Sequence, residues 1–194
     1  IGSNAVDLSY SSSASTTRGA TGNASTAMGE STTASGNSST AMGFQTTASG
    51  ENSTAMGGST EASGNASTAM GQSTEASSLY STAMGYNTEA SGQISTAMGA
   101  STKASGNSST AMGVNTIASG DASTAMGGNT EASGENSTAM GDETTASDYG
   151  SLVIGQYNSS GSSVTSSATA FSTANTAFVI GNGANSVSSS DAFK

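Results

Sequence analysis

Ser81-Thr82-Ala83-Met84-Gly85 is one copy of a five-residue segment that recurs every fourteen residues along this 194-residue chain. All nine methionines lie in copies of it, from Met28 to Met140. After each copy a Thr follows the Gly by three residues and an Ala follows by five, as Thr88 and Ala90 do here. The composition is rich in Ser and Gly and would suit a flexible linker, but a linker has no reason to keep this register. The period therefore predicts a folded repeat protein.

Fourteen residues per repeat fit two short strands joined by two tight turns. A helix is disfavoured because each repeat carries Gly, Ser and Thr where a helix interior needs good helix formers. We expect a first strand at Ser25–Met28 and a second at Thr32–Ser35, broken at Gly29 and Gly36, which relieve the backbone restrictions of the turns. Stacked coils would pair in parallel about 4.8 Å apart. The expected fold is all-β, a parallel β-roll solenoid with 14-residue coils and two sheets.

Comparison of the repeats with one another assigns side chains to the faces of each strand. In the second strand the slot between Thr32 and Ala34 changes freely, for example to Glu61 or Lys103, so it should face water while its neighbours face the interior. In the first strand no slot varies, which indicates burial on both faces. We interpret the Thr/Met side as the roll core and the Ser/Ala side as packed against another chain.

Each assignment covers the equivalent residues of every repeat. The roll-core set is Thr26, Met28, Thr32, Ala34, Met42, Met56, Met70, Met84, Met98, Met112, Met126, Met140 and Ile154. The set facing another chain is Ser25, Ala27, Ser39, Ala41, Ser53, Ala55, Ser67, Ala69, Ser81, Ala83, Ser95, Ala97, Ser109, Ala111, Ser123, Ala125, Ser137 and Ala139. One Met, two Ala and two Thr methyls per coil provide only about half of the apolar burial needed to order fourteen residues, which predicts an obligate oligomer.

Charge and missing residue types exclude several functions. Three basic against 13 acidic residues give a formal net charge of −10, which disfavours binding to nucleic acid or anionic membranes. Without His or Cys the chain lacks the usual bases, thiol nucleophiles and zinc ligands, so we expect no enzyme, cofactor or metal site. The longest apolar run, Ala177–Ile180, is far shorter than a membrane helix. No signal peptide follows the opening Ile1, and we expect a segment of a longer protein.

The tandem repeat resembles the YadA-like head repeat of trimeric autotransporter adhesins, in which Ser-Val-Ala-Ile-Gly is followed by a half containing Ala-x-Gly. Thr26 and Met28 stand where that family has Val and Ile, and Ser151-Leu152-Val153-Ile154-Gly155 is closer to the family form. The resemblance covers residues 20–159. It implies a homotrimer of left-handed parallel β-rolls on a Gram-negative cell surface, anchored in the outer membrane. Such a head would bind host extracellular matrix, a host cell-surface receptor or other bacteria.

The repeat pattern also divides the chain into three parts. Residues 1–19 are expected to form irregular N-terminal coils, residues 20–145 nine regular repeats, and residues 146–194 degenerate repeats with a C-terminal cap. In the last part Ile180 follows Ile154 by 26 residues rather than 28, which predicts a loop or degenerate coil over 159–169. The stretch Ala177–Phe193 resembles coils that precede self-cleaving chaperone domains in phage tail spikes. An alternative function is therefore a structural segment of a trimeric fibre.

A few exposed positions are candidates for ligand binding. We expect a ligand patch at Leu79, Tyr80, Tyr86 and Ile94, although these residues could instead pack across a neighbouring chain. The Glu residues that recur in the variable slot of successive coils predict a solvated face, with a cation or a basic ligand as the alternative. The repeated Thr leaves ice binding as a minor alternative, because our face assignment points the Thr side chains inward.

Overall fold

The computed structural model describes residues 1–11, 18–159 and 167–193 of the chain. Within these ranges every regular element is a β-strand, and the strands build a parallel β-solenoid with the predicted 14-residue period. The solenoid divides into two compact units, Ile1–Ile94 and Ser95–Lys194. No helix in the described ranges is long and apolar enough to span a membrane.

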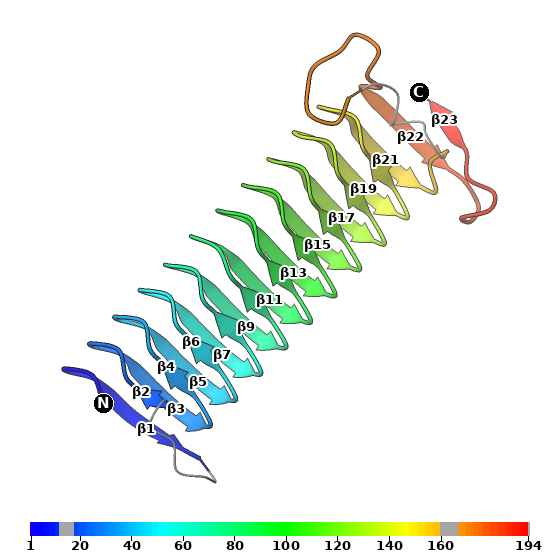
Figure 1. Ribbon diagram of the computed structural model, residues 1–194. Coiled ribbons are helices and arrows are strands. Elements are labelled where there is room, and N and C mark those ends of the chain that lie inside the picture. The colour runs from blue at the N-terminus through cyan, green and yellow to red at the C-terminus, as the bar shows by residue number, and fades with distance from the viewer. Residues whose placement is uncertain (12–17, 160–166, 194) are drawn as a thin grey trace. The chain divides into compact units, whose positions relative to one another are not determined.

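In the first unit, long strands alternate along the chain with two-residue strands, and each kind forms its own parallel sheet (Figure 1). Equivalent residues of successive coils pair in register, as Met84 does with Met70. The long-strand sheet contains, in order, β1 (Val6–Tyr10), β3 (Thr26–Glu30), β5 (Thr40–Phe44), β7 (Thr54–Gly58), β9 (Thr68–Gln72) and β11 (Thr82–Tyr86). The short-strand sheet contains β2 (Gly19–Ala20), β4 (Thr33–Ala34), β6 (Thr47–Ala48), β8 (Glu61–Ala62), β10 (Glu75–Ala76) and β12 (Glu89–Ala90).

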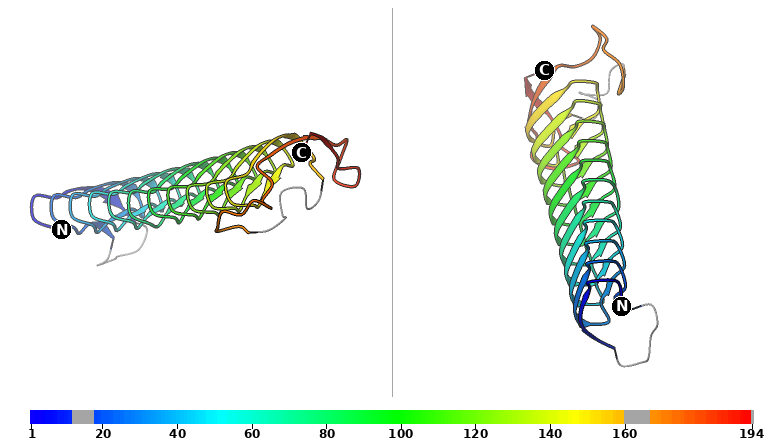
Figure 2. Two further views of the ribbon diagram at one scale, coloured as in Figure 1. Left: turned by 90° about the horizontal axis from the view of Figure 1, so that it is seen from above. Right: turned by 90° about the vertical axis from the view of Figure 1, so that its left-hand side faces the viewer.

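The second unit repeats this arrangement and adds a different ending. Its long-strand sheet contains β13 (Thr96–Ala100), β15 (Thr110–Val114), β17 (Thr124–Gly128), β19 (Thr138–Asp142), β21 (Leu152–Gln156), β22 (Phe178–Asn182) and β23 (Asp191–Phe193). Its short-strand sheet contains β14 (Lys103–Ala104), β16 (Ile117–Ala118), β18 (Glu131–Ala132) and β20 (Thr145–Ala146). Figure 2 shows the coils of each unit stacked with their two sheets on opposite sides.

The strand ends differ from the prediction at the glycines. The long strand runs Thr26–Glu30 and continues through Gly29, which has φ 113°, so this glycine does not break the strand. The turn comes two residues later, at Ser31, whose φ of 57° is in the left-handed region. The equivalent turn residues Gln45 and Ser59 share this conformation. Polar residues tolerate it better than β-branched ones, which explains why glycine is not required at the turn itself.

Small side chains fill the interior of each coil. In the coil of β11 and β12 the inward side chains are Ser81, Ala83, Thr88 and Ala90, and each is at most 1% exposed. Some of the buried serines, such as Ser53, donate their hydroxyl to the carbonyl of the glycine three residues earlier. The interior is therefore too narrow for anything larger than Thr or, in the last coils, Val.

The face assignment of the first strand is wrong and must be reversed. Ser25 and Ala27 are fully buried inside the coil, whereas Thr26 is half-buried and Met28 is 39% exposed on the outer side. The same holds in every regular repeat: the Ser and Ala slots that were assigned to another chain lie inside, and the Met slots assigned to the roll core lie outside. Ile154 is likewise outside, with Val153 buried. Two sheets closed by fourteen residues leave room for Ala but not for Met.

The face assignment of the second strand is confirmed: the residues on either side of the variable slot point into the coil. Thr32 and Ala34 are fully buried. The Thr hydroxyls of this inner row have no hydrogen-bond partner, from Thr32 to Thr144 in every regular repeat of the described residues. A row of buried, unpaired hydroxyls is unfavourable, so the fold tolerates Thr here for its size and shape rather than for its polarity.

The C-terminal end closes with one enlarged coil. β22 pairs directly with β21, with Ile180 opposite Ile154, so these paired residues are 26 positions apart in the chain instead of 14. The predicted loop over 159–169 falls mainly on residues 160–166, which lie outside the described residues. From Ser167 onward the enlarged coil is anchored to the preceding coils: the backbone N–H of Thr176 donates to the buried carboxylate of Asp148 at 2.9 Å. β23 then pairs antiparallel with β22.

We predict that the glycines of the regular long strands cannot carry a side chain. Gly57 has φ 121°, and a Cβ atom built on it would overlap the carbonyl oxygen of Gly71 in the next coil. Gly57→Ala should therefore lower Tm by about 5 °C or more in a melt followed by circular dichroism. Gly58→Ala is the matched control, since nothing lies within 4 Å of a Cβ at that position. Equal melting of the two variants would refute the constraint.

A second prediction concerns the unpaired hydroxyls of the interior. Thr74→Val keeps the shape of the side chain and removes a buried oxygen that has no partner, so it should stabilise the fold by about 1 kcal/mol. Thr47→Val is the control, because Thr47 occupies the outward slot that other repeats fill with Glu, Lys or Ile. A Thr74→Val variant that unfolds more easily than the parent chain would show that the hydroxyl has a partner.

Candidate functional site

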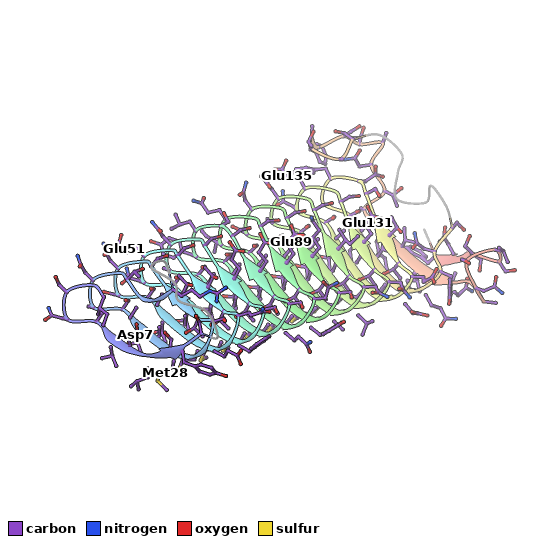
Figure 3. All side chains as sticks on the ribbon, turned by 60° about the horizontal axis from the view of Figure 1, so that its bottom comes forward. Asp7, Met28, Glu51, Glu89, Glu131 and Glu135 are labelled. Atoms are coloured by element: carbon purple, nitrogen blue, oxygen red, sulfur yellow. The ribbon has the colours of Figure 1, made fainter. Side chains whose placement is uncertain are left out.

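The outer side of the long-strand sheet carries two rows of side chains that we call the Thr/Met face. Its residues are the first and third of each long strand, such as Thr82 and Met84 of β11. Most of them are half-buried, and Figure 3 shows Met28 projecting away from the stacked strands. Because the strands pair in register, each row runs unbroken from strand to strand within a unit.

Larger apolar residues occupy the same two rows at the end strands. In the first unit Val6 and Leu8 of β1 pair with Thr26 and Met28 of β3, and both are more than half exposed. In the second unit Leu152 and Ile154 pair with the Thr and Met of β19, and Phe178 and Ile180 follow on β22. Sequence reasoning missed Val6 and Leu8 because β1 lacks the repeated segment. The alternation of apolar residues at positions 6, 8 and 10 was the signal that could have identified them.

Such a face is suited to association with another protein surface. An apolar stripe that runs along a sheet is larger than the scattered apolar residues of an ordinary monomer surface. Methionine is flexible and polarisable, so it can fill an irregular contact without a fixed shape. Thr beside it provides a methyl group for packing and a hydroxyl for a hydrogen bond. The geometry of the Thr/Met face therefore favours burial of this side of the solenoid.

The residues of the predicted ligand patch lie at two different places. Leu79 and Tyr80 occupy the turn before β11, and Ile94 occupies the equivalent turn one coil later, where its N–H donates to the carbonyl of Leu79 at 2.9 Å. Tyr86 lies at the other end of β11, so the five-residue strand separates it from Tyr80. Tyr80, Tyr86 and Ile94 are each more than half exposed, and Leu79 is half-buried. The structure thus brings together three of the four residues.

Hydrogen bonds between coils hold the row of turns that precedes the long strands. Asn65 accepts a hydrogen bond at its Oδ1 atom from the backbone N–H of Glu51 at 3.1 Å. Asp121 accepts one in the same way from Asn107 at 2.9 Å. Figure 3 shows Glu51 at the edge of the coils, in the slot that Leu79 fills two coils later. A polar residue is therefore the usual structural choice in this slot, and Leu79 is an exception.

Acidic side chains are stacked on the short-strand sheet of the first unit. Glu61, Glu75 and Glu89 pair in parallel register on β8, β10 and β12. Their carboxylates are therefore neighbours in a ladder with a strand spacing of about 4.8 Å. The hydroxyl of Ser91 donates to Oε1 of Glu89 at 2.9 Å. Among the described residues no group of three or more acidic, His or Cys side chains is placed to hold a metal ion.

Comparison with protein families identifies the repeat. A family model described as the YadA head domain repeat (2 copies) matches residues 20–46, 48–74, 62–88, 76–102, 90–116, 104–130 and 132–158. These matches cover well over half of the chain and extend from β3 to β21. Comparison with individual curated proteins gave no significant match.

We predict a measurable electrostatic effect where acidic residues lie beside tyrosines. The Tyr10 hydroxyl donates to Glu30 at 2.9 Å, and this hydrogen bond and the carboxylate charge raise the pKa of Tyr10 above 10.0. Because the folded-state pKa is raised, the stabilising contribution is present below pH 10 and is lost as the pH rises through the raised pKa. Glu30→Gln should lower the pKa of Tyr10 in an NMR titration.

Tyr157 provides the internal control for this titration. Its pKa is raised mainly by the charge of Asp142, so Asp142→Asn should lower the pKa of Tyr157 and leave Tyr10 unchanged. A Glu30→Gln variant in which the Tyr10 titration does not move would show that the hydrogen bond does not form.

Proposed function

The chain belongs to the YadA head domain family, and from that membership we propose that it is the head of a trimeric bacterial surface adhesin. The family is one of structural, adhesin-type β-solenoids rather than a known enzyme family. We propose that the head attaches to host extracellular matrix, host cells or other bacteria, and that it is displayed outside the outer membrane. The observation that carries the proposal is the Thr/Met face.

The reversed face assignment changes which residues would meet in the trimer. The Ser and Ala slots are inside the coil and cannot contact another chain. The Thr/Met face is apolar, continuous within each unit and only partly covered. Three such faces packed around an axis would bury the methionines and supply the apolar burial that a single coil lacks. The trimer contact is therefore proposed on the side formerly assigned to the core.

Ligand binding is proposed for the surfaces that this contact leaves open. These are the outer side of the short-strand sheet and the turns, which carry the variable residues of each repeat. Residues 20–145 would then form the binding part of the head, with residues 1–19 and 146–194 as its two ends. A structural segment of a trimeric fibre uses the same solenoid and the same trimer contact, and differs only in having no adhesive surface.

A second candidate function follows from the outward position of the Thr26 row. The sequence predicts inward Thr side chains, which disfavours ice binding, but the Thr26 row lies on the outer side of the sheet. Regularly spaced Thr hydroxyls on a flat sheet could order water. The Met row beside them provides no second hydroxyl, so adhesion stays the first proposal. Thermal hysteresis measured at high protein concentration distinguishes the two, since an adhesin head would show none.

We predict that charges on the Thr/Met face prevent assembly. Met56→Glu combined with Met70→Glu should weaken self-association at least about 100-fold, because carboxylates would be buried without partners. Sedimentation equilibrium should then show the mass of one chain where the parent protein shows three. The variant should also lose adhesion to immobilised matrix and to cultured cells, if adhesion requires the trimer.

Thr47→Glu is the matched control for this experiment. It adds one carboxylate in the outward slot of the short-strand sheet, which the next coil already fills with Glu61. The control should remain trimeric. A parent chain that sediments as a stable, folded monomer at micromolar concentration would contradict the trimer, and a trimer that adheres to nothing would favour the fibre segment.

A further inference from the structure

Two consecutive turns carry bulky apolar residues in a backbone conformation that disfavours them. Tyr80 has φ 58° and Ile94 has φ 59°, both in the left-handed region. This region is unfavourable for large side chains and most of all for β-branched ones such as Ile. In the other coils of the first unit the same slot holds small or polar residues, namely Ala24, Ser38, Asn52 and Ala66. The fold therefore does not need Tyr or Ile here.

Within residues 1–11, 18–159 and 167–193, these two side chains remain largely exposed. Tyr80 is 57% exposed and Ile94 is 56% exposed. The N–H of Tyr80 donates to the carbonyl of Asn65, and that of Ile94 to the carbonyl of Leu79, as the equivalent residues do in neighbouring coils. The backbone is therefore that of an ordinary repeat, and it gains no extra hydrogen bond from the bulky residues. Strained residues that the fold does not require point to a role in binding.

A second unfavourable feature occurs in the same coils. Glu61, Glu75 and Glu89 are neighbours in the acidic ladder, and like charges in paired strands repel each other. The coil of Glu61 has Ala66 at its turn, and the slot one repeat after Glu89 holds Lys103. Glu75 precedes Tyr80 by five residues, and Glu89 precedes Ile94 by five. Each of these two coils therefore carries one acidic side chain and one bulky turn residue. Five residues of chain span at most about 18 Å, which one extended ligand segment of similar length can cover. Charge and apolar surface are thus within reach of a single partner.

We propose that Leu79, Tyr80 and Ile94, together with Glu75 and Glu89, form a docking site for a basic protein segment that carries apolar side chains. This inference rests on the proposed adhesin function and names the class of its ligand. The apolar residues of the partner pack on Tyr80 and Ile94, and its Lys or Arg side chains neutralise the two carboxylates. A Lys or Arg can also lie against the ring of Tyr80. The acidic net charge of −10 favours such a partner over an acidic one.

The experiment uses the full chain and three short labelled peptides of equal length. One alternates Lys and Leu, one alternates Lys and Ser, and one alternates Glu and Leu. Fluorescence anisotropy should show that the Lys/Leu peptide binds at least about tenfold more tightly than either of the others. Its affinity should fall as salt is added, because part of the attraction is between exposed charges. Equal binding of the Lys/Ser peptide, or no binding of the Lys/Leu peptide, would overturn the proposal.

Substitutions test whether the peptide binds at this site. Tyr80→Asn with Ile94→Asn should weaken binding of the Lys/Leu peptide about tenfold and raise Tm by a few degrees, because Asn tolerates the left-handed conformation. Tyr86→Asn is the matched control. Tyr86 is 56% exposed but is the last residue of β11, at the opposite end of the strand from Tyr80, so peptide binding should not change. A purely structural role of the turn would make the double variant less stable, and that result would reject the site.

The acidic half of the site has its own control in the second unit. Glu75→Gln with Glu89→Gln should remove most of the salt dependence of peptide binding. Glu131→Gln changes the same slot in a coil whose turn holds Glu135 and Asn136, and it should not change peptide binding.

Sedimentation of each variant separates the docking site from the trimer contact. Loss of the trimer in the Tyr80/Ile94 variant would mean that these residues pack between chains. A parent chain that binds the peptide but neither trimerises nor adheres would refute the proposed function alone.

Discussion

Each coil of this solenoid lies one strand spacing from the next, and at the glycines that spacing leaves no room for a Cβ atom. A Cβ on Gly57 would overlap the carbonyl oxygen of Gly71, and a Cβ on Gly50 would overlap that of Gly64. The first glycine lies in the long strand and the second in the turn that precedes it. The turn slot holds Ser78 and Asp148 in two coils, whereas the long-strand glycine recurs in every regular coil. The long-strand glycine is therefore the one that the close stacking of the coils requires.

The same closeness limits what the interior can hold and decides where bulk must go. The two sheets enclose Ala, Ser and Thr, and in the last coils Val153 and Val179. No methionine fits there, so the largest side chain of each repeat lies outside, on the Thr/Met face. A solenoid with such a thin interior gains little from burial within one chain. Its apolar side chains can stabilise the fold only by contact with another surface, which is the physical reason for proposing a trimer.

The period, the two parallel sheets and the inward direction of Thr32 and Ala34 could be predicted because the sequence varies at one slot and not at its neighbours. The faces of the long strand could not, because Ser25 to Met28 are constant in every repeat. Alternation along a strand assigns its side chains to two faces but does not say which face is inside. A shift of one residue exchanges the two faces. Hydrophobicity favoured Met for the core, whereas the volume of the coil, which no single residue reveals, excludes it. Similarly, the spacing of 26 between Ile154 and Ile180 is compatible with one coil or two, and only the strand pairing decides.

In a repeat protein each coil serves as a control for the others. Where all regular coils share a residue, the stacking or the assembly explains it, as with the glycines of the long strands and the Thr/Met face. Where one coil differs and the exception is favourable, the difference carries no information about function. Tyr80 and Ile94 are exceptions that the backbone disfavours, and each follows a Glu of the acidic ladder by five residues. The acidic ladder covers three coils and the bulky turns two of them, so a ligand with apolar and basic side chains would offset both features where they overlap.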